Sequence, residues 1–151
     1  MHGLRDSKRS PDGCHDEASL RAAKLWGVVV GLAQAATPLL FWWLDAATVY
    51  AIGTVGIAFV YIGFAVADGR PKVIAVETGV AAGFVTLAAV AITGSPWLLV
   101  AALAGHGVKD LWQHRTHFVR GTRWWPPFCM IVDWVVAAII VGEIAAGMHF
   151  R

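Results

Sequence analysis

Five apolar stretches, each about as long as a bilayer is thick, take up most of the sequence and constrain its fold more than any other feature. They cover residues 24–44, 48–67, 73–92, 97–113 and 127–147. A helix needs about 20 mostly apolar residues to cross the hydrocarbon core of a membrane. Inside that core every backbone polar group must be satisfied within the helix itself. The sequence therefore predicts an all-α, polytopic membrane protein, a bundle of five transmembrane helices.

Composition and length agree with this class. Of the 151 residues, 58% are hydrophobic and 15% are charged, whereas a soluble domain has about a quarter charged residues. We expect residues 24–148 to form a single transmembrane domain. Residues 1–23 mix basic and acidic side chains and lack the pattern of a signal peptide, so we expect a disordered, polar cytoplasmic tail. The basic residues are spread among short loops, which argues against a nucleic-acid partner.

The distribution of lysine and arginine predicts the orientation. If all five stretches span the membrane and the N-terminus is cytoplasmic, 11 of the 12 basic residues lie at the cytoplasmic side, and Arg151 alone lies outside. Such an excess is the positive-inside pattern. A model with four spans loses it, so residues 97–113 are expected to span. The prediction is a multi-pass protein of the cell membrane (the plasma or inner membrane).

Three carboxylates interrupt the apolar stretches at one depth. At about 1.5 Å per helical residue, Glu77 and Asp110 lie roughly 7 Å inside the cytoplasmic boundary, and Asp133 roughly 9 Å inside it. Carboxylates in hydrocarbon are costly and usually face the interior of a bundle. We therefore expect these three side chains, from three different helices, to converge on a polar pocket that opens to the cytoplasm.

The fourth stretch adds imidazoles to the carboxylates. At about 100° per residue, its polar side chains fall within an arc of roughly 100° on one helix face; they are His106, Asp110, Gln113, His114 and His117. Histidine and carboxylate ligands together suit iron, zinc or manganese. The predicted metal ligands are His106, Asp110, His114 and Glu77. Asp133 is the predicted general base or orienting residue. The other predicted pocket residues are His117, Cys129, Lys109 and Gln113.

The residues leave three interpretations of this pocket open, because three neighbouring carboxylates cannot all stay charged without compensation. A divalent cation could bind among them, as in a metal-dependent enzyme acting on a lipophilic substrate. One or more could be protonated, as in a proton- or cation-coupled transport element. A structural ion network could pair them with Lys109, Arg70 or Arg115, as in an accessory subunit of a larger membrane complex.

Two pairs of glycines four residues apart indicate close helix packing. Gly27 and Gly31 lie in the first stretch, and Gly79 and Gly83 in the third. Such pairs let helix backbones approach each other closely. Besides the lipid bilayer and a lipophilic small molecule, the expected partners are thus further copies of the chain or other membrane subunits at these two faces. The spacing does not decide whether the contacts lie within or between chains.

The run "HGVKDLWQHRTHFVRGTRWWPPFCMIVD", residues 106–133, resembles a group of small, uncharacterised bacterial membrane proteins with several spans. They pair a His-x-x-x-Asp helix with a following Trp-x-Pro-x-Phe-Cys-x-x-x-Asp segment. The resemblance implies no established activity. Fatty-acid hydroxylase-like di-iron enzymes of membranes are less similar, because they need more histidines, in H-x-x-H-H-type clusters, than this run contains.

Overall fold

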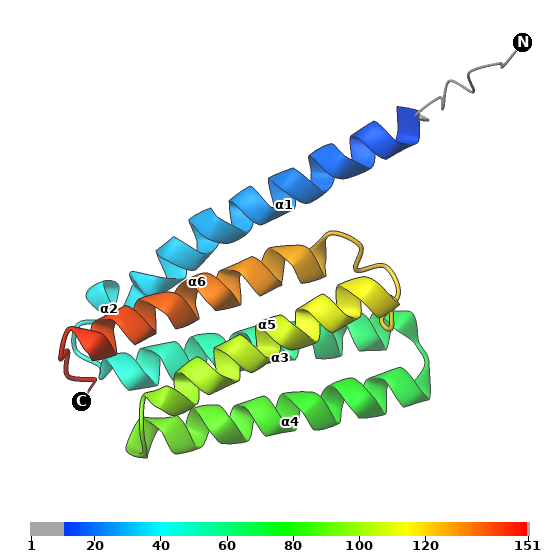
Figure 1. The fold of residues 1–151 in the computed structure, drawn as a ribbon. Helices are drawn as coiled ribbons and strands as arrows, with labels where there is room; N and C mark the ends of the chain where they lie inside the picture. The colour runs from blue at the N-terminus through cyan, green and yellow to red at the C-terminus, as the bar shows by residue number, and fades with distance from the viewer. Residues whose placement is uncertain (1–10, 151) are drawn as a thin grey trace, which may run out of the picture.

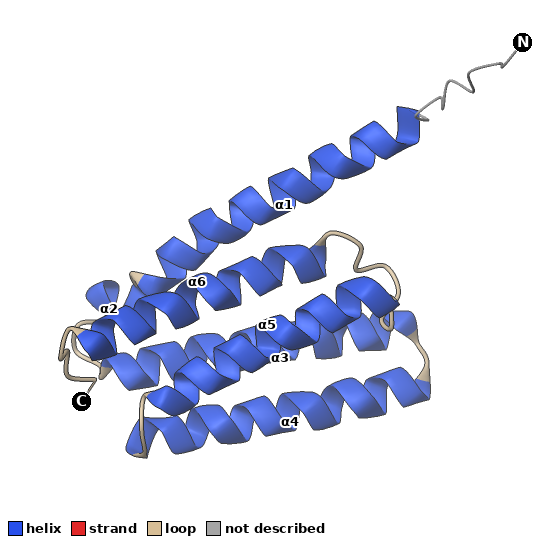
Figure 2. Ribbon diagram, viewed as in Figure 1, coloured by secondary structure: helices blue, strands red, loops and turns tan. Residues whose placement is uncertain are grey.

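The computed structural model describes residues 11–150 of the chain, with side chains from residue 17 onward. This part is all helical and contains no strand (Figure 2). Its elements are α1 (Pro11–Ala35), α2 (Thr37–Leu40), α3 (Ala46–Asp68), α4 (Pro71–Thr93), α5 (Trp97–Thr116) and α6 (Trp125–Ala145). The predicted all-α class is confirmed.

The five long helices lie alongside one another in a bundle. Helix α6 lies between α1 and α5, and α3 and α4 form a second pair that packs against α5 (Figure 1). Helix α1 packs closely against α6 but makes no comparable contact with α3. Its N-terminal part extends past the ends of the other helices (Figure 1).

Four segments of the described chain are long and apolar enough to cross a membrane: Glu17–Leu40, Ala46–Asp68, Pro71–Thr93 and Trp125–Ala145. Helix α5 does not belong to this set, because it carries Lys109, Asp110 and two histidines. Length and composition therefore support a membrane protein. Five spans and a cytoplasmic N-terminus stay predictions.

The first helix begins earlier than the sequence suggested. Residues 11–23, which we expected to belong to a disordered tail, are the beginning of α1. The segment from Glu17 to Lys24 is rich in alanine, leucine and charged residues with high helix propensity. Arg21 also pairs with Glu17 one turn earlier, at 3.7 Å. The rest of the expected tail, residues 1–10, lies outside the described residues.

The predicted first span is not one continuous helix. Helix α1 ends at Ala35, and the short helix α2 follows, with Pro38 in its first turn. Proline has no N–H group to continue the helix, and its ring clashes with the carbonyl of the residue four positions earlier. That carbonyl, of Gln34, instead accepts a hydrogen bond from the Thr37 hydroxyl at 2.6 Å.

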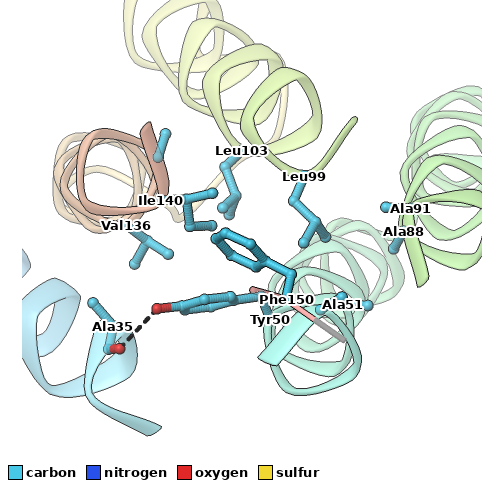
Figure 3. Packing of buried hydrophobic residues seen from close by; sticks show 12 residues of the cluster. Ala35, Tyr50, Ala51, Ala88, Ala91, Leu99, Leu103, Val136, Ile140 and Phe150 are labelled. Carbon is cyan, nitrogen blue, oxygen red and sulfur yellow. Dashed lines mark hydrogen bonds between the residues drawn. The ribbon is translucent and has the colours of Figure 1, made fainter. Parts of the chain in front are cut away.

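Two apolar clusters divide the core of the bundle along its length. The large apolar cluster includes Tyr50, Leu99, Leu103, Val136, Ile140 and Phe150 (Figure 3). In it, the Tyr50 hydroxyl donates to the carbonyl of Ala35 at 2.9 Å. The small apolar cluster consists of Tyr61, Ala65, Val73 and Val119. Along α4, α5 and α6 the buried polar residues fall between the two clusters.

The two glycine pairs differ in their surroundings. A Cβ atom on Gly27 would lie 2.7 Å from the carbonyl oxygen of Phe128, and one on Gly31 would lie 2.9 Å from the Cβ of Val135. The first pair thus lets α1 approach α6 of the same chain. A partner at the Gly27 and Gly31 face stays a prediction. Around Gly79 and Gly83 no described residue lies within 4 Å of such an atom. A partner at that face stays a prediction.

Candidate metal centre

Three ionisable side chains meet at the interface of α5 and α6. The Nδ1 atom of His106 lies 2.8 Å from Oδ2 of Asp133 and 3.6 Å from Oδ2 of Asp110. The exposed fractions of His106, Asp110 and Asp133 are 2%, 0% and 0%. One potential ligand atom from each residue lies within 4.8 Å of the others, so the three side chains could hold a metal ion.

The local sequence explains why these side chains meet. His106 and Asp110 are four residues apart on α5 and therefore project from the same face. Between them Gly107 lets α6 come close, because a Cβ atom there would overlap the indole ring of Trp134. Trp134 directly follows Asp133. The close approach of the two helices at this level brings the Asp133 carboxylate to the imidazole.

The Asp110 carboxylate is buried without a hydrogen bond. Neither of its oxygens accepts one from any residue that the structure describes, and the same holds for Oδ1 of Asp133. The Tyr61 hydroxyl lies near Asp110, but the two groups do not form a hydrogen bond of normal geometry. A charged group removed from water is costly unless it is paired or coordinates a metal. These oxygens have lone pairs that accept no hydrogen bond, so a bound cation or a proton would stabilise the buried carboxylates.

A second polar group lies beside the first and joins α4 to α5. The Lys109 ammonium pairs with Glu77 at 2.7 Å, and the Gln113 amide donates a hydrogen bond to the same carboxylate. Lys109 also lies over the ring of Tyr61, 3.2 Å from its centroid. The Tyr61 ring contacts the His106 imidazole edge-to-face at 5.8 Å. Tyr61 thus separates the Glu77–Lys109 pair from the His106 group.

The charges of the two groups do not balance. Glu77, Asp110 and Asp133 are at most 1% exposed. Even with both His106 and Lys109 protonated, two cations face three carboxylates. A buried excess of negative charge is unfavourable, so the two groups together have room for one more positive charge. The additional positive charge fits beside Asp110, because Glu77 already forms an ion pair with Lys109.

The polar groups are closed off where α5 ends, which corrects the expected open pocket. The connection between α5 and α6 folds back over them, and the buried Val119 donates its N–H to Gln113 Oε1 at 3.2 Å. The next residue, Arg120, donates its N–H to Asp68 at 2.8 Å. Asp68 also pairs with Arg70 at 2.5 Å. These bonds hold an apolar residue over the site at this end of the bundle.

The structure brings together some of the predicted site residues and not others. His106, Asp110 and Asp133 meet, and Glu77, Lys109 and Gln113 form the neighbouring group. Buried Cys129 lies one turn before Asp133 on α6. The two remaining histidines lie away from both groups.

His114 is half-buried and lies near Lys24 of α1. His117 is exposed and ends α5 with a left-handed backbone, φ 50°. Tyr61, Asp68 and Val119 were missed by the sequence reasoning. Of these three residues, only Tyr61 carries a signal in the sequence, because its polar aromatic side chain interrupts an apolar stretch.

No protein-family model, no curated protein and no solved structure matches the chain. What the protein can do is therefore inferred from the geometry of the buried cluster.

Proposed function

We propose that the protein is a multi-pass membrane protein of the plasma or inner membrane that binds one divalent transition-metal ion at His106, Asp110 and Asp133. The burial of Asp110, with both oxygens lacking a hydrogen bond, carries the proposal. In this proposal all five long helices span the membrane and the N-terminus is cytoplasmic. Helix α5 spans in spite of its charges because His106, Asp110 and Gln113 are buried between helices.

The spacing of the ligand atoms supports a shared ion. Imidazole nitrogens and carboxylate oxygens bind zinc at about 2.0–2.2 Å. Ligand atoms around one such ion are therefore roughly 3.0–3.5 Å apart in tetrahedral or octahedral geometry. The separations of 2.8 and 3.6 Å from His106 Nδ1 to the two carboxylates lie close to this range. Small side-chain movements would be enough to complete the site.

The three ligand side chains indicate which metal ions the site suits and what chemistry it could support. One imidazole with two carboxylates is richer in oxygen than the two-histidine, one-carboxylate set of many iron enzymes, and oxygen ligands suit manganese. Iron and zinc remain compatible with it. Three protein ligands leave coordination positions for water or a substrate, as catalytic metal sites require. A reaction on a lipophilic substrate is the enzymatic form of this proposal, with Asp133 as a ligand or as the residue that orients His106.

The two alternatives find less support in the arrangement. A proton or cation path across the membrane needs polar groups that continue to the other side. Beyond His106 the described residues along the bundle axis form the large apolar cluster, which includes Leu99, Leu103 and Ile140. A structural ion pair describes Glu77 and Lys109 well, but it leaves the Asp110 oxygens without a hydrogen bond.

Metal analysis of the detergent-purified protein tests the proposal. After growth with iron, zinc and manganese, we expect about one ion per chain. Asp110→Asn keeps the shape of the side chain and removes its charge, so the ion content should fall by more than about tenfold. The matched control is Glu143→Gln, on α6 as Asp133 is but half-buried and bonded to Tyr50 at 3.2 Å. It should retain the metal.

Thermal melting separates the metal site from an ion network. Without metal, Asp110→Asn should melt no lower than the wild-type protein, because it removes an uncompensated buried charge. Added metal should stabilise only the wild-type protein. Wild-type protein without stoichiometric metal, together with a variant that melts lower under all conditions, would overturn the proposal in favour of a structural network.

A further inference from the structure

A cavity along α1 has an apolar wall and a cationic end. It has a volume of about 590 Å³ and lies between α1 and the beginning of α6. Trp26, Val30 and Phe128 form much of its wall. At one end lie Arg123 and Trp124, in the connection that leads into α6. Arginine and tryptophan are typical of the level of lipid headgroups.

A second cavity continues the first toward the interior of the bundle. It has a volume of about 360 Å³ and is lined by residues of α1, α3 and α6, among them Gln34, Gly53 and Cys129. Val30 and Phe128 line both cavities, so the two adjoin. We call them together the α1 trough. It exists because α1 packs on α6 and makes no comparable contact with α3.

The dimensions of the α1 trough fit an acyl chain. Along α1 its lining residues run from Ser19 to Gln34, a length of roughly 22 Å at about 1.5 Å per residue. One leaflet contributes about half of the roughly 30 Å hydrocarbon core. An acyl chain that fills one leaflet, about 15 Å, is therefore shorter than the trough and can lie within it with its headgroup at Arg123.

We propose that the α1 trough binds one acyl chain of an anionic phospholipid, with the headgroup at Arg123. Both flanking helices, α1 and α6, are apolar enough to cross a membrane, so lipid is what surrounds the opening. Guanidinium groups suit phosphate, so the charge of Arg123 favours an anionic headgroup at this end. Arg120, three residues earlier, adds positive charge at the same end. A zwitterionic lipid gains less from these two charges than an anionic one.

The lipid site does not depend on the metal. On α6 its deep part reaches Cys129 and Val132, and Val132 directly precedes Asp133. If both proposals hold, the acyl chain lies against the helix that supplies a metal ligand. The Asp110→Asn variant separates the two ideas, because it should lose the metal and keep the lipid.

Native mass spectrometry of the detergent-released protein tests the binding. We expect one phosphatidylglycerol per chain, retained more strongly than phosphatidylcholine. Val30→Trp fills the trough and should weaken phosphatidylglycerol binding by at least about tenfold, because each buried methylene adds to the affinity. Val29→Trp is the matched control. Val29 is 54% exposed on the same helix and does not line the trough, whereas Val30 is 38% exposed.

Two further measurements keep the test independent of how the variants fold. Arg123→Gln should reduce the preference for phosphatidylglycerol over phosphatidylcholine several-fold. On the wild-type protein, phosphatidylglycerol with a photoreactive acyl chain should crosslink to peptides that contain Val30 and Phe128. Equal binding by the two tryptophan variants, or crosslinks spread over all lipid-facing positions of α1, would overturn the proposal. A lipid-free dimer that Val30→Trp dissociates would show that a second copy occupies the trough instead.

Discussion

His106 Nδ1 lies 2.8 Å from Asp133 on the neighbouring helix but 3.6 Å from Asp110 on its own helix. The imidazole thus links α5 to α6. Asp110, although it is closer to His106 in the sequence, receives no hydrogen bond of normal length from it. A purely structural network would satisfy Asp110 as well, since buried polar groups are nearly always paired. This asymmetry is the main reason why we assign the Asp110 side of the cluster to a ligand.

The Glu77–Lys109 pair is expected to stabilise the fold without affecting the metal. Glu77→Gln keeps the hydrogen-bonding shape beside Gln113 but leaves the Lys109 charge without its partner. The free energy of unfolding should fall by about 3 kcal/mol, as for other buried pairs that lose one member. Denaturation in mixed detergent micelles measures it.

A double variant provides the control for this pair. Glu77→Gln combined with Lys109→Met removes both charges and should recover most of the lost stability. Metal content should stay at the wild-type level in the single variant. Loss of the metal on Glu77→Gln would mean that Glu77 belongs to the metal site after all.

The glycine pairs should respond oppositely to the same substitution. Gly27→Ala places a methyl group 2.7 Å from a backbone oxygen of α6, and overpacking of this kind costs about 1–3 kcal/mol of stability. Gly83→Ala meets no described residue within 4 Å and should stabilise the monomer slightly, through the higher helix propensity of alanine. The measurement is the melting temperature of each variant. Both substitutions gain the same helix propensity, so the difference between the two melting temperatures reports the packing alone. Equal melting temperatures would contradict the packing of α1 on α6.

The side of the membrane on which each end of α5 lies tests the five-span topology. In a background without native cysteines, Ser95→Cys and Arg120→Cys place thiols at exposed positions before and after the helix. A membrane-impermeant maleimide should label the first in intact cells and the second only after permeabilisation. Labelling of both from one side would show that α5 does not span. The reverse pattern would place the N-terminus outside.

The sequence predicted the helices better than it predicted the site. Apolar length placed the span of residues 73–92 within α4, Pro71–Thr93, because hydrophobicity and the helical period are local properties. The same period correctly placed His106 beside Asp110. Counting depth also brought Asp133 to their level, because helices in a bilayer share one axis direction and one boundary.

The remaining parts of the site depend on contacts that no local pattern encodes. His114 lies on the predicted polar stripe, one turn further along the helix, where the charged groups around it include Lys24 and Arg115 and none of the three carboxylates. Glu77 is buried in the bundle as predicted, but its carboxylate forms an ion pair with Lys109 and not with the His106 group. The fold-back of Val119 onto Gln113 is determined by bonds between distant segments, such as that of Arg120 to Asp68.

The position of Val119 also determines how quickly the site can exchange its contents. An ion bound at Asp110 is enclosed by the large apolar cluster on one side and by Val119 and its neighbours on the other. Exit on the Val119 side requires residues 117–124 to detach, and such local openings have a free energy of their own. The residence time of the ion is then governed by the frequency of this opening and not by the strength of the metal–ligand bonds. A chelator would empty the protein slowly even if the intrinsic affinity were modest, and loading would be fastest while the chain is still folding.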